Sequence, residues 1–414
     1  MERIVMVGAS LAALRAAETL RGEDFDGSIT LVGAEPHRPY DRPPLSKKLL
    51  AGEWEPDRVA LRKADAFDAL DVEWCLGVAA TGLDLAGRTV ALADGSEVPF
   101  DGLVLACGAR PKALPGVPFT DPAVAADARP MVTALRTLDD SLALRARLAS
   151  GDQRVVVIGA GFIGLEVAAT ARGLGNDVVV LEGASAPLIR ALGGEMGAAV
   201  SAFHADHGVE IRCDVRVAGV DTSGVRLEPA DGVSEVVPAD VVVVGIGVEP
   251  ATDWLEGSGL ELRDGIVCDA TLATRGAPEG VPVFAAGDVA RWPNELFGEE
   301  MRVEHWTNAA EQGMVAAKAL LSFAAGEEPE PYAPVPFFWS DQYDRRIQFL
   351  GRASADDDVQ IVSGAVDDRT FLALFGREGR LRGALGLNAP KLVMPYRALL
   401  EQRISWDDAL ARVE

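Results

Sequence analysis

Residues 3–13 and 154–164 share one pattern of hydrophobic and polar positions. In each segment a β-branched apolar run is followed by a turn of small residues. An alanine-rich stretch with helical spacing comes next, at 14–20 and 165–174, and a second apolar run follows it, at 28–32 and 177–181. The order strand, turn, helix, strand therefore occurs twice, and it predicts two units that are each built on a parallel sheet.

Shorter apolar runs outside these repeats predict further strands. They lie at 89–93, 97–100, 103–106, 241–244, 283–286, 346–350 and 370–375. Asp94-Gly95 is typical of a tight hairpin turn, and Gly245-Ile246-Gly247 gives the run at 241–244 a βα-like character. The two repeats predict an α/β protein. From about residue 322 the chain becomes richer in aromatic residues and contains the strand-like runs at 346–350 and 370–375, so we expect a separate C-terminal α+β domain.

The second turn carries a complete Gly-x-Gly-x-x-Gly motif at Gly159, Gly161 and Gly164. The first glycine permits a tight turn, the second lets the backbone approach a pyrophosphate, and the third lets helix and strand pack closely. Glu182 ends the next strand, where a carboxylate accepts hydrogen bonds from an adenosine ribose and repels a 2′-phosphate. The motif therefore predicts a dinucleotide site that prefers NADH over NADPH.

The first turn keeps the spacing of this motif with Gly8, Ser10 and Ala13. Its second strand leads to Glu35, which is the corresponding candidate for a ribose contact. Two dinucleotide units in one chain suggest two dinucleotides that react with each other. The natural pair is FAD and NADH, because a flavin accepts a hydride from nicotinamide.

Composition narrows the possible partners and the setting. The 414-residue chain has a net charge of −24, which opposes binding to nucleic acid and to anionic lipid. No apolar stretch approaches the roughly 20 residues of a membrane span. The four cysteines show no metal-ligand spacing and are expected to be reduced, buried thiols. Because the first residues lack the features of a secretory signal, we expect a cytoplasmic protein.

Seven segments together carry a family resemblance, and they are residues 8–13, 39–47, 106–111, 159–164, 245–250, 285–288 and 339–342. The sequence resembles the FAD-dependent pyridine nucleotide-disulfide oxidoreductase superfamily, and within it the ferredoxin reductases of bacterial monooxygenases and ring-hydroxylating dioxygenases. Arg-Pro-Pro-Leu-Ser-Lys at 42–47 and Trp-Ser-Asp-Gln at 339–342 are the segments most specific to this branch. The resemblance covers nearly the whole chain.

This resemblance implies a fold of the glutathione-reductase type with two Rossmann-like dinucleotide-binding domains and the C-terminal α+β domain. The expected boundaries are 1–112 for the first part of the FAD-binding domain, 113–240 for the NAD-binding domain, 241–321 for the second FAD-binding part and 322–414 for the C-terminal domain. FAD is expected to be tightly but not covalently bound.

The resemblance also implies the cofactor-binding residues. Those assigned to FAD are Gly8, Ser10, Leu11, Ala12, Ala13, Glu35, Arg42, Lys47, Val78, Arg136, Gly287, Asp288 and Trp306. Those assigned to NADH are Gly159, Gly161, Phe162, Ile163, Gly164, Glu166, Glu182 and Arg190. Further cofactor-binding candidates are Ala106, Arg110, Gly245 and Gly247. Lys47, beside the flavin ring, and Glu166, near the nicotinamide amide, are the expected catalytic residues.

The implied reaction passes a hydride from NADH to FAD and then single electrons to a 2Fe-2S ferredoxin, which feeds a cytochrome monooxygenase or a ring-hydroxylating dioxygenase. The loop at 43–48 has no cysteine where disulfide reductases of this superfamily carry a pair, so electrons are expected to leave the flavin directly. The alternatives are a rubredoxin reductase, a monodehydroascorbate-type reductase, a nitrite reductase flavin subunit, and an NADH-sensing flavoprotein resembling apoptosis-inducing factor. The chain is expected to be a monomer or a weak homodimer.

Structural explanations compete with several of these assignments. Lys47 could begin a surface helix, and Glu166 could form a buried salt bridge without a function, because a carboxylate inside an apolar helix needs a partner. Asp288 could be a helix N-cap. Trp306 could be a core aromatic residue.

Overall fold

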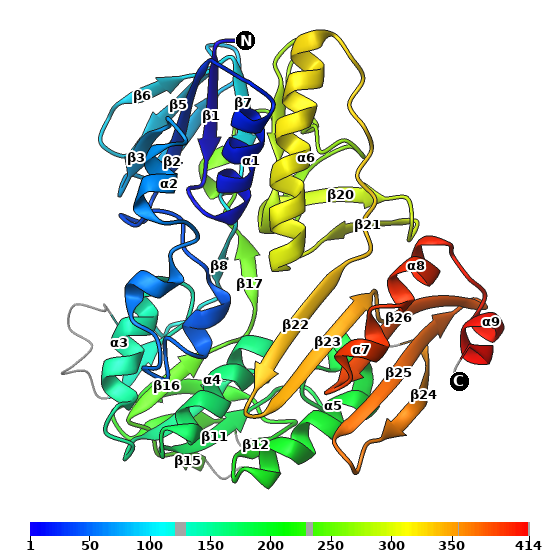
Figure 1. Ribbon diagram of the computed structural model, residues 1–414. Helices are drawn as coiled ribbons and strands as arrows, with labels where there is room; N and C mark the ends of the chain where they lie inside the picture. The colour runs from blue at the N-terminus through cyan, green and yellow to red at the C-terminus, as the bar shows by residue number, and fades with distance from the viewer. Residues whose placement is uncertain (121–129, 229–234, 355, 413–414) are drawn as a thin grey trace. The chain divides into compact units, whose positions relative to one another are not determined.

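The computed structural model describes residues 1–120, 130–228, 235–354 and 356–412 (Figure 1). The chain divides into two compact units. Unit 1 consists of Met1–Asp41, Ala60–Arg110 and Glu249–Phe337, and unit 2 consists of Arg42–Val59, Pro111–Val248 and Phe338–Glu414. Among the described residues, no helix is long and apolar enough to cross a membrane.

Unit 1 is built around a parallel five-stranded sheet in the order β19-β7-β1-β2-β3. These strands are β1 (Arg3–Val7), β2 (Ser28–Gly33), β3 (Glu73–Leu76), β7 (Gly102–Leu105) and β19 (Val283–Ala285). The unit also contains the hairpin strands β4 (Ala80–Asp84), β5 (Thr89–Leu92) and β6 (Glu97–Pro99), and a second small sheet of β18 (Ile266–Val267), β20 (Ala290–Asn294) and β21 (Glu299–Arg302). The predicted hairpin around Asp94-Gly95 is confirmed, because β5 and β6 pair antiparallel.

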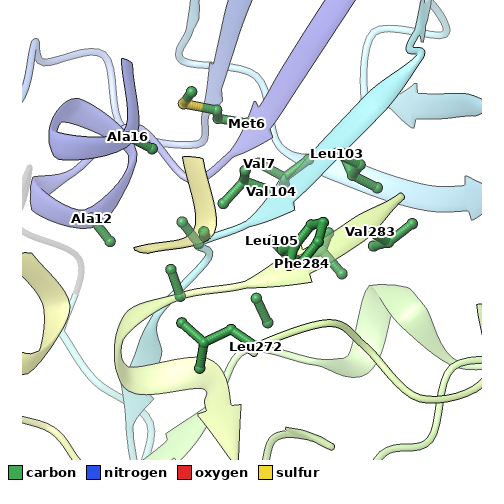
Figure 2. Packing of buried hydrophobic residues seen from close by; sticks show 14 of the residues in the cluster. Met6, Val7, Ala12, Ala16, Leu103, Val104, Leu105, Leu272, Val283 and Phe284 are labelled. Carbon is green, nitrogen blue, oxygen red and sulfur yellow. The ribbon is translucent and has the colours of Figure 1, made fainter. Parts of the chain in front are cut away.

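Two helices of unit 1 pack side by side, α1 (Leu11–Gly22) and α6 (Trp306–Ala325) (Figure 1). A Cβ atom at Gly313 would lie 2.1 Å from the Ala12 carbonyl oxygen, so glycine is what lets the two helix backbones approach. The apolar side chains of the parallel strands and of α1 join in one core, part of which Figure 2 shows. This packing fixes the amino-terminal end of α1 against the sheet. The short helix α2 (Ala64–Asp68) completes the unit.

Unit 2 contains a second parallel sheet, in the order β12-β11-β10-β16-β9. Its strands are β9 (Met131–Thr133), β10 (Arg154–Ile158), β11 (Asp177–Leu181), β12 (Glu210–Arg212) and β16 (Val241–Val244). Its helices are α3 (Leu138–Leu148), α4 (Phe162–Gly173) and α5 (Ile189–Asp206), and a small sheet consists of β13 (Val217–Asp221), β14 (Gly224–Leu227) and β15 (Glu235–Val237). Both predicted strand, turn, helix, strand repeats are therefore confirmed.

The expected place of the strand at 241–244 was wrong. We assigned it to the second part of the FAD-binding domain and expected a helix after it. Strand β16 instead pairs with β10 in the second sheet, and β17 (Val248–Pro250) follows it and pairs with β8 (Ala109–Pro111). Four consecutive valines fit any buried strand, so the sequence pattern does not say which sheet receives them.

The C-terminal part of unit 2 is a five-stranded sheet in the order β22-β23-β26-β25-β24. The strands are β22 (Phe337–Gln342), β23 (Arg345–Gly351), β24 (Asp358–Ala365), β25 (Thr370–Arg377) and β26 (Arg380–Leu387), and the helices after them are α7 (Pro390–Val393), α8 (Tyr396–Glu401) and α9 (Trp406–Ala411). Three pairs of neighbouring strands, β23 with β26, β26 with β25, and β25 with β24, are antiparallel. The strands predicted at 346–350 and 370–375 and the α+β character of this part are thus confirmed.

The cysteines differ from the expectation in their burial. All four are free thiols, but only Cys268 is buried, and Cys75, Cys107 and Cys213 are half-buried. Burial nevertheless raises the pKa of the Cys107 thiol to about 11, so this thiol is protonated at neutral pH and is a poor nucleophile.

Candidate functional site

The glycine turn after β10 has the geometry that its motif predicts. Gly159 has a φ of +102°, and a Cβ atom there would lie 2.4 Å from the Gly245 carbonyl oxygen. A Cβ atom at Gly164 would lie 2.3 Å from the Gly159 carbonyl oxygen, whereas a Cβ at Gly161 would meet only the Gly245 oxygen, at 3.9 Å. Gly159 and Gly164 are therefore required for packing within the turn, and Gly161 leaves open space beside it.

This open space adjoins the amino-terminal end of α4. The α4 N-cap is Gly161, which has no side chain that could accept from the first amides, and no acidic residue stands in the first turn among the described residues. In contrast, Thr137 and Asp140 cap α3 with a reciprocal pair of hydrogen bonds. The first amides of a helix have no partner inside the helix, and an uncapped end is a ready site for a phosphate group. Ile163, in this first turn, is exposed.

Glu182 lies directly after β11 and is tied to the turn. Its Oε2 atom accepts a hydrogen bond from the Ala160 amide at 2.7 Å, and its Oε1 atom accepts one from the Ala184 amide at 2.8 Å. The carboxylate is thus held at the edge of the glycine turn, where the sequence predicted a ribose contact. Each of its oxygens keeps a further lone pair for such a contact.

The first turn, after β1, is built in the same way. Gly8 has a φ of +115°, and a Cβ atom there would lie 2.0 Å from the Ala106 carbonyl oxygen. The α1 helix that follows has no side-chain cap from Ser10 and no acid in its first turn among the described residues. At Gly287 a Cβ atom would contact the Ala12 Cβ at 3.5 Å. The structure therefore brings four predicted cofactor residues together, Gly8, Ala12, Ala106 and Gly287.

Glu35 and Val78 also come together in unit 1. The Gly77 amide donates to the Glu35 carbonyl oxygen at 3.0 Å, and the Val78 amide donates to the Gly33 carbonyl oxygen at 3.1 Å. The Tyr40 hydroxyl donates to the Glu35 carboxylate. Sequence reasoning did not single out Tyr40, although it lies inside one of the segments that carried the resemblance. Glu35 and Val78 were predicted to serve the ribose and the adenine, and their proximity is consistent with that arrangement.

The open, uncapped turns fit dinucleotides in both units. Each pairs a glycine of positive φ with a helix whose first amides are available for a pyrophosphate, and each is followed by a strand that leads to a carboxylate. The residues present therefore match the donor set that two dinucleotides need.

A second group of predicted residues gathers around Glu166 in unit 2. Glu166 is buried in α4, and its Oε2 atom accepts hydrogen bonds from the Lys47 Nζ atom at 2.6 Å and from the Ser46 hydroxyl at 2.5 Å. Its Oε1 atom accepts one from the Ser340 hydroxyl at 2.6 Å. The carboxylate in the apolar helix therefore has three donors, which satisfy the demand that its burial imposes.

Lys47 does not begin a surface helix. It follows a 3-10 turn over Pro43–Ser46, and only 17% of its side chain is exposed. Besides Glu166, its Nζ atom donates to the Pro43 carbonyl oxygen at 2.9 Å. Lys47 and Glu166 were the two residues expected to be catalytic, and they form one ion pair.

Other predicted residues have contacts within one unit. The Arg42 guanidinium donates to the Arg136 carbonyl oxygen at 2.5 Å. Trp306 is the first residue of α6 and donates from its Nε1 atom to Asp41 at 2.7 Å. Arg110 forms ion pairs with Glu249 at 2.8 Å and with Asp253. These contacts leave the cofactor assignments of these residues as predictions.

Asp288 is not a helix N-cap. It is the middle residue of a 3-10 turn over Gly287–Val289, and β20 follows that turn. Arg190 stands in α5, and its side chain lies outside the part of the chain that the structure describes. Gly247 has a φ of +103° and open space where a Cβ would lie.

Residues that the sequence analysis gave no role complete the Glu166 cluster. They are Ser46, Ser340, Gln342 and His204. Ser340 and Gln342 alternate with Trp339 and Asp341 along β22, and both are buried. Two polar side chains at inward positions of a strand were the signal that could have revealed them.

The chain is similar to two described families and to named proteins. The family description "Pyridine nucleotide-disulphide oxidoreductase" matches residues 2–313, and "Reductase C-terminal" matches residues 337–412. The chain is 38% identical over 401 residues to rhodocoxin reductase from Rhodococcus erythropolis, covering 96% of this chain and 89% of that protein. It is 37% identical over 402 residues to the ferredoxin–NAD(+) reductase component of the anthranilate 1,2-dioxygenase system from Burkholderia cepacia, covering 96% of this chain and 93% of that protein.

Solved structures extend the similarity to the fold. The reductase in the crystal structure of the covalent putidaredoxin reductase–putidaredoxin complex matches with a TM-score of 0.88 and 31% identity. That match covers 99% of this chain and 95% of the other. The comparison thus spans both units and the C-terminal sheet.

Proposed function

The chain belongs to the pyridine nucleotide-disulphide oxidoreductase family, and we propose that it is an FAD-dependent NADH:ferredoxin reductase. The observation that carries this proposal is the pair of glycine turns, each in front of an uncapped helix and each in its own parallel sheet. Two dinucleotide sites in one chain suit a flavin and a nicotinamide. The similarity of the whole chain to named ferredoxin reductases supports the same reading.

In this proposal unit 1 holds FAD. The amides of Leu11, Ala12 and Ala13 at the start of α1 would bind its pyrophosphate, and Glu35 its adenosine ribose. Bound FAD supplies the chemistry that connects a two-electron donor to a one-electron acceptor. The protein's contribution is to bind both nucleotides, to orient them and to exclude water.

Unit 2 would bind NADH at the α4 turn. The amides of Phe162, Ile163 and Gly164 would meet the pyrophosphate, and Glu182 would accept hydrogen bonds from the ribose hydroxyls. A 2′-phosphate next to this carboxylate would be repelled, so NADH is the proposed donor rather than NADPH.

The Lys47–Glu166 ion pair is our candidate for the residues that assist hydride transfer. Lys47 would provide a fixed positive charge that stabilises negative charge arising on reduction, and Glu166 would fix Lys47 and orient the nicotinamide amide. A reaction of this kind needs positioning and electrostatics rather than a general base.

A 2Fe-2S ferredoxin is the proposed acceptor. The Pro43–Lys48 loop offers no cysteine for a disulfide relay, so electrons would pass straight from the bound flavin to the partner. Such a ferredoxin would in turn supply a terminal oxygenase. Putidaredoxin reductase, whose structure resembles this chain, was crystallised in a covalent complex with putidaredoxin.

The test is the visible spectrum of the purified protein followed by anaerobic mixing with NADH. We expect a yellow protein that NADH bleaches and that reduces ferricyanide and a 2Fe-2S ferredoxin in steady state. Lys47→Ala should slow flavin reduction while the FAD content stays that of the wild type. A preparation that remains colourless after reconstitution with FAD would contradict the proposal. If NADH reduced the flavin but the protein did not then reduce ferricyanide or ferredoxin in steady state, the result would favour the NADH-sensing flavoprotein.

A further inference from the structure

A chain of hydrogen bonds leads from Glu166 into the C-terminal sheet, all of it within unit 2. The Ser340 hydroxyl that donates to Glu166 accepts a hydrogen bond from the Gln342 Nε2 atom at 3.0 Å. The Gln342 Oε1 atom lies 2.8 Å from the His204 Nε2 atom. The His204 Nδ1 atom lies 3.1 Å from the Tyr343 hydroxyl. Ser340, Gln342 and His204 are at most 1% exposed.

The Glu166 carboxylate sets the direction of every bond in this chain. Because the carboxylate only accepts, the single Ser340 proton is committed to it, and Ser340 must accept from Gln342. The NH2 group of Gln342 therefore faces Ser340, and its oxygen faces His204. The His204 Nε2 atom must then carry the proton, so the Nδ1 atom accepts from the Tyr343 hydroxyl.

The backbone is strained at Tyr343, the last residue of this series of hydrogen bonds. Tyr343 adopts a φ of +53°, a region that bulky residues seldom enter. Its ring stacks on His207 with ring centroids 3.8 Å apart and an interplanar angle of 9°. This arrangement holds the Tyr343 hydroxyl against His204. Strain of this kind persists where the surrounding structure fixes it, and it is concentrated at functional sites.

We propose that Ser340, Gln342 and His204 are positioning residues that fix the Glu166 carboxylate against Lys47 for hydride transfer. This inference rests on the proposed function, since it assigns the Lys47–Glu166 pair to that step. Two strand residues and one helix residue, distant in the sequence, would thus let the C-terminal sheet act on the reaction through Glu166. A fully satisfied buried network of this type holds its members in one arrangement.

The kinetic test uses the FAD-loaded protein and anaerobic stopped-flow mixing with NADH. Ser340→Ala removes the donor to Glu166. Gln342→Glu places an acceptor opposite Ser340 and draws its proton away from Glu166. We expect both variants to lower the limiting rate constant of flavin reduction by about tenfold, by analogy with the loss of a hydrogen bond that orients a metal ligand. The NADH concentration that gives half of the limiting rate should change less than twofold.

His204 offers a conservative rescue. The terminal amide of glutamine can place an N–H near the position of the His204 Nε2 atom, whereas leucine cannot donate. His204→Gln should therefore keep most of the wild-type rate constant, and His204→Leu should lose it. The matched control is Gln348→Leu. This substitution removes a buried glutamine amide that belongs to the same sheet but not to the hydrogen bonds between Glu166 and Tyr343. It should leave the rate constant unchanged even where it lowers the melting temperature.

A readout independent of turnover is the tautomer of His204, observed as its ¹⁵N chemical shifts in the oxidised, FAD-loaded protein. We expect a protonated Nε2 atom in the wild type and a mixture of tautomers in Ser340→Ala. A wild-type proton on Nδ1 would overturn the inference. So would wild-type rate constants in both Ser340→Ala and Gln342→Glu. Failure of the wild-type protein itself to be reduced by NADH would instead refute the proposed function.

Discussion

At the scale of single residues, one carboxylate is expected to decide the choice of nucleotide. Glu182 holds the Ala160 and Ala184 amides and faces the site proposed for the ribose. We predict that Glu182→Arg lowers the ratio of kcat/KM for NADH to that for NADPH by at least about tenfold, because a hydrogen bond to a charged group is worth about 1.5 to 3 kcal/mol. The measurement is the steady-state rate with each nucleotide at varied concentration.

Two variants control this experiment. Glu182→Gln keeps an oxygen that can accept from the Ala160 amide, so it separates loss of charge from loss of the turn contact. Glu210→Ala removes an exposed carboxylate from the neighbouring strand β12 and should leave the ratio unchanged. An unchanged ratio in Glu182→Arg would show that Glu182 does not face the ribose.

His204 predicts how stability depends on pH. Burial lowers its pKa from the usual 6.5 to about 4; the hydrogen bond with Gln342 opposes this shift, and the nearby His207 adds a smaller lowering. The folded chain therefore favours the neutral imidazole, and below pH 6.5 the unfolded chain binds more protons. This contribution to stability, at most about 3 kcal/mol, is complete above pH 6.5 and is lost as the pH falls toward 4.

The check is the melting temperature of the FAD-loaded protein between pH 7.5 and pH 4.5. We expect the wild type to lose more stability over this interval than His204→Gln, which has no titrating group at the position. Parallel curves for the two proteins would contradict the assigned pKa. Acid-induced loss of FAD, followed by absorbance in the same samples, must be excluded as the cause.

Prediction at the level of residues succeeded where the neighbouring residues in the sequence determine what a side chain needs. The demand of Glu166 for a partner followed from its place in an apolar helix, and the structure supplies Lys47. Ser340 and Gln342 were missed because their partners, Glu166 and His204, come from distant parts of the sequence. Tyr40 was missed although its partner, Glu35, lies only five residues before it. A strand pattern indicates that a polar side chain faces inward, but only tertiary packing decides which group it meets.

At the scale of elements, two glycines of the turn after β10 are expected to have different roles, one in packing and one in nucleotide binding. At Gly159 both the positive φ and the Gly245 carbonyl oxygen, 2.4 Å away, oppose a Cβ atom. Gly161 has a φ of −78° and open space. We predict that Gly159→Ala lowers the melting temperature and the yield of folded protein, since it combines strain with a clash.

Gly161→Ala is expected to behave differently. It should keep the wild-type melting temperature, while the dissociation constant for NAD⁺ rises at least about tenfold because the methyl group occupies the path of the pyrophosphate. Titration calorimetry with NAD⁺ and differential scanning calorimetry measure the two effects. Equal affinities in Gly161→Ala and the wild type would place the nucleotide elsewhere.

Element boundaries were predictable because turns and periodic runs are local signals. The strand at 177–181 and the hairpin around Asp94-Gly95 lie where they were expected. The sheet that receives β16 was not predictable, since four valines in a row suit any buried parallel strand. Strand order depends on which helices cover the sheet, and that information is spread over the whole unit.

At the scale of the whole molecule, a net charge of −24 opposes association with an acidic ferredoxin. Productive docking therefore requires a local cluster of positive charge that outweighs the total field at short range. Near the end of β22, Arg346 forms an ion pair with Asp341 at 2.6 Å, and Arg345 lies 3.4 Å from Asp344. Lys391, on α7, adjoins the exposed side chains of Leu392 and Met394.

This charge distribution predicts that salt affects one of two assays of the same protein and leaves the other unchanged. Raising ionic strength from 0.05 to 0.5 M shortens the screening length from about 14 Å to about 4 Å, so the KM for an acidic 2Fe-2S ferredoxin should rise. The rate of flavin reduction by NADH should stay constant. Lys391→Glu should raise the ferredoxin KM several-fold at low salt, and Lys318→Glu, the same charge change on α6, should have little effect. A ferredoxin KM that is independent of salt would show that docking depends on apolar contacts such as Leu392 rather than on charge.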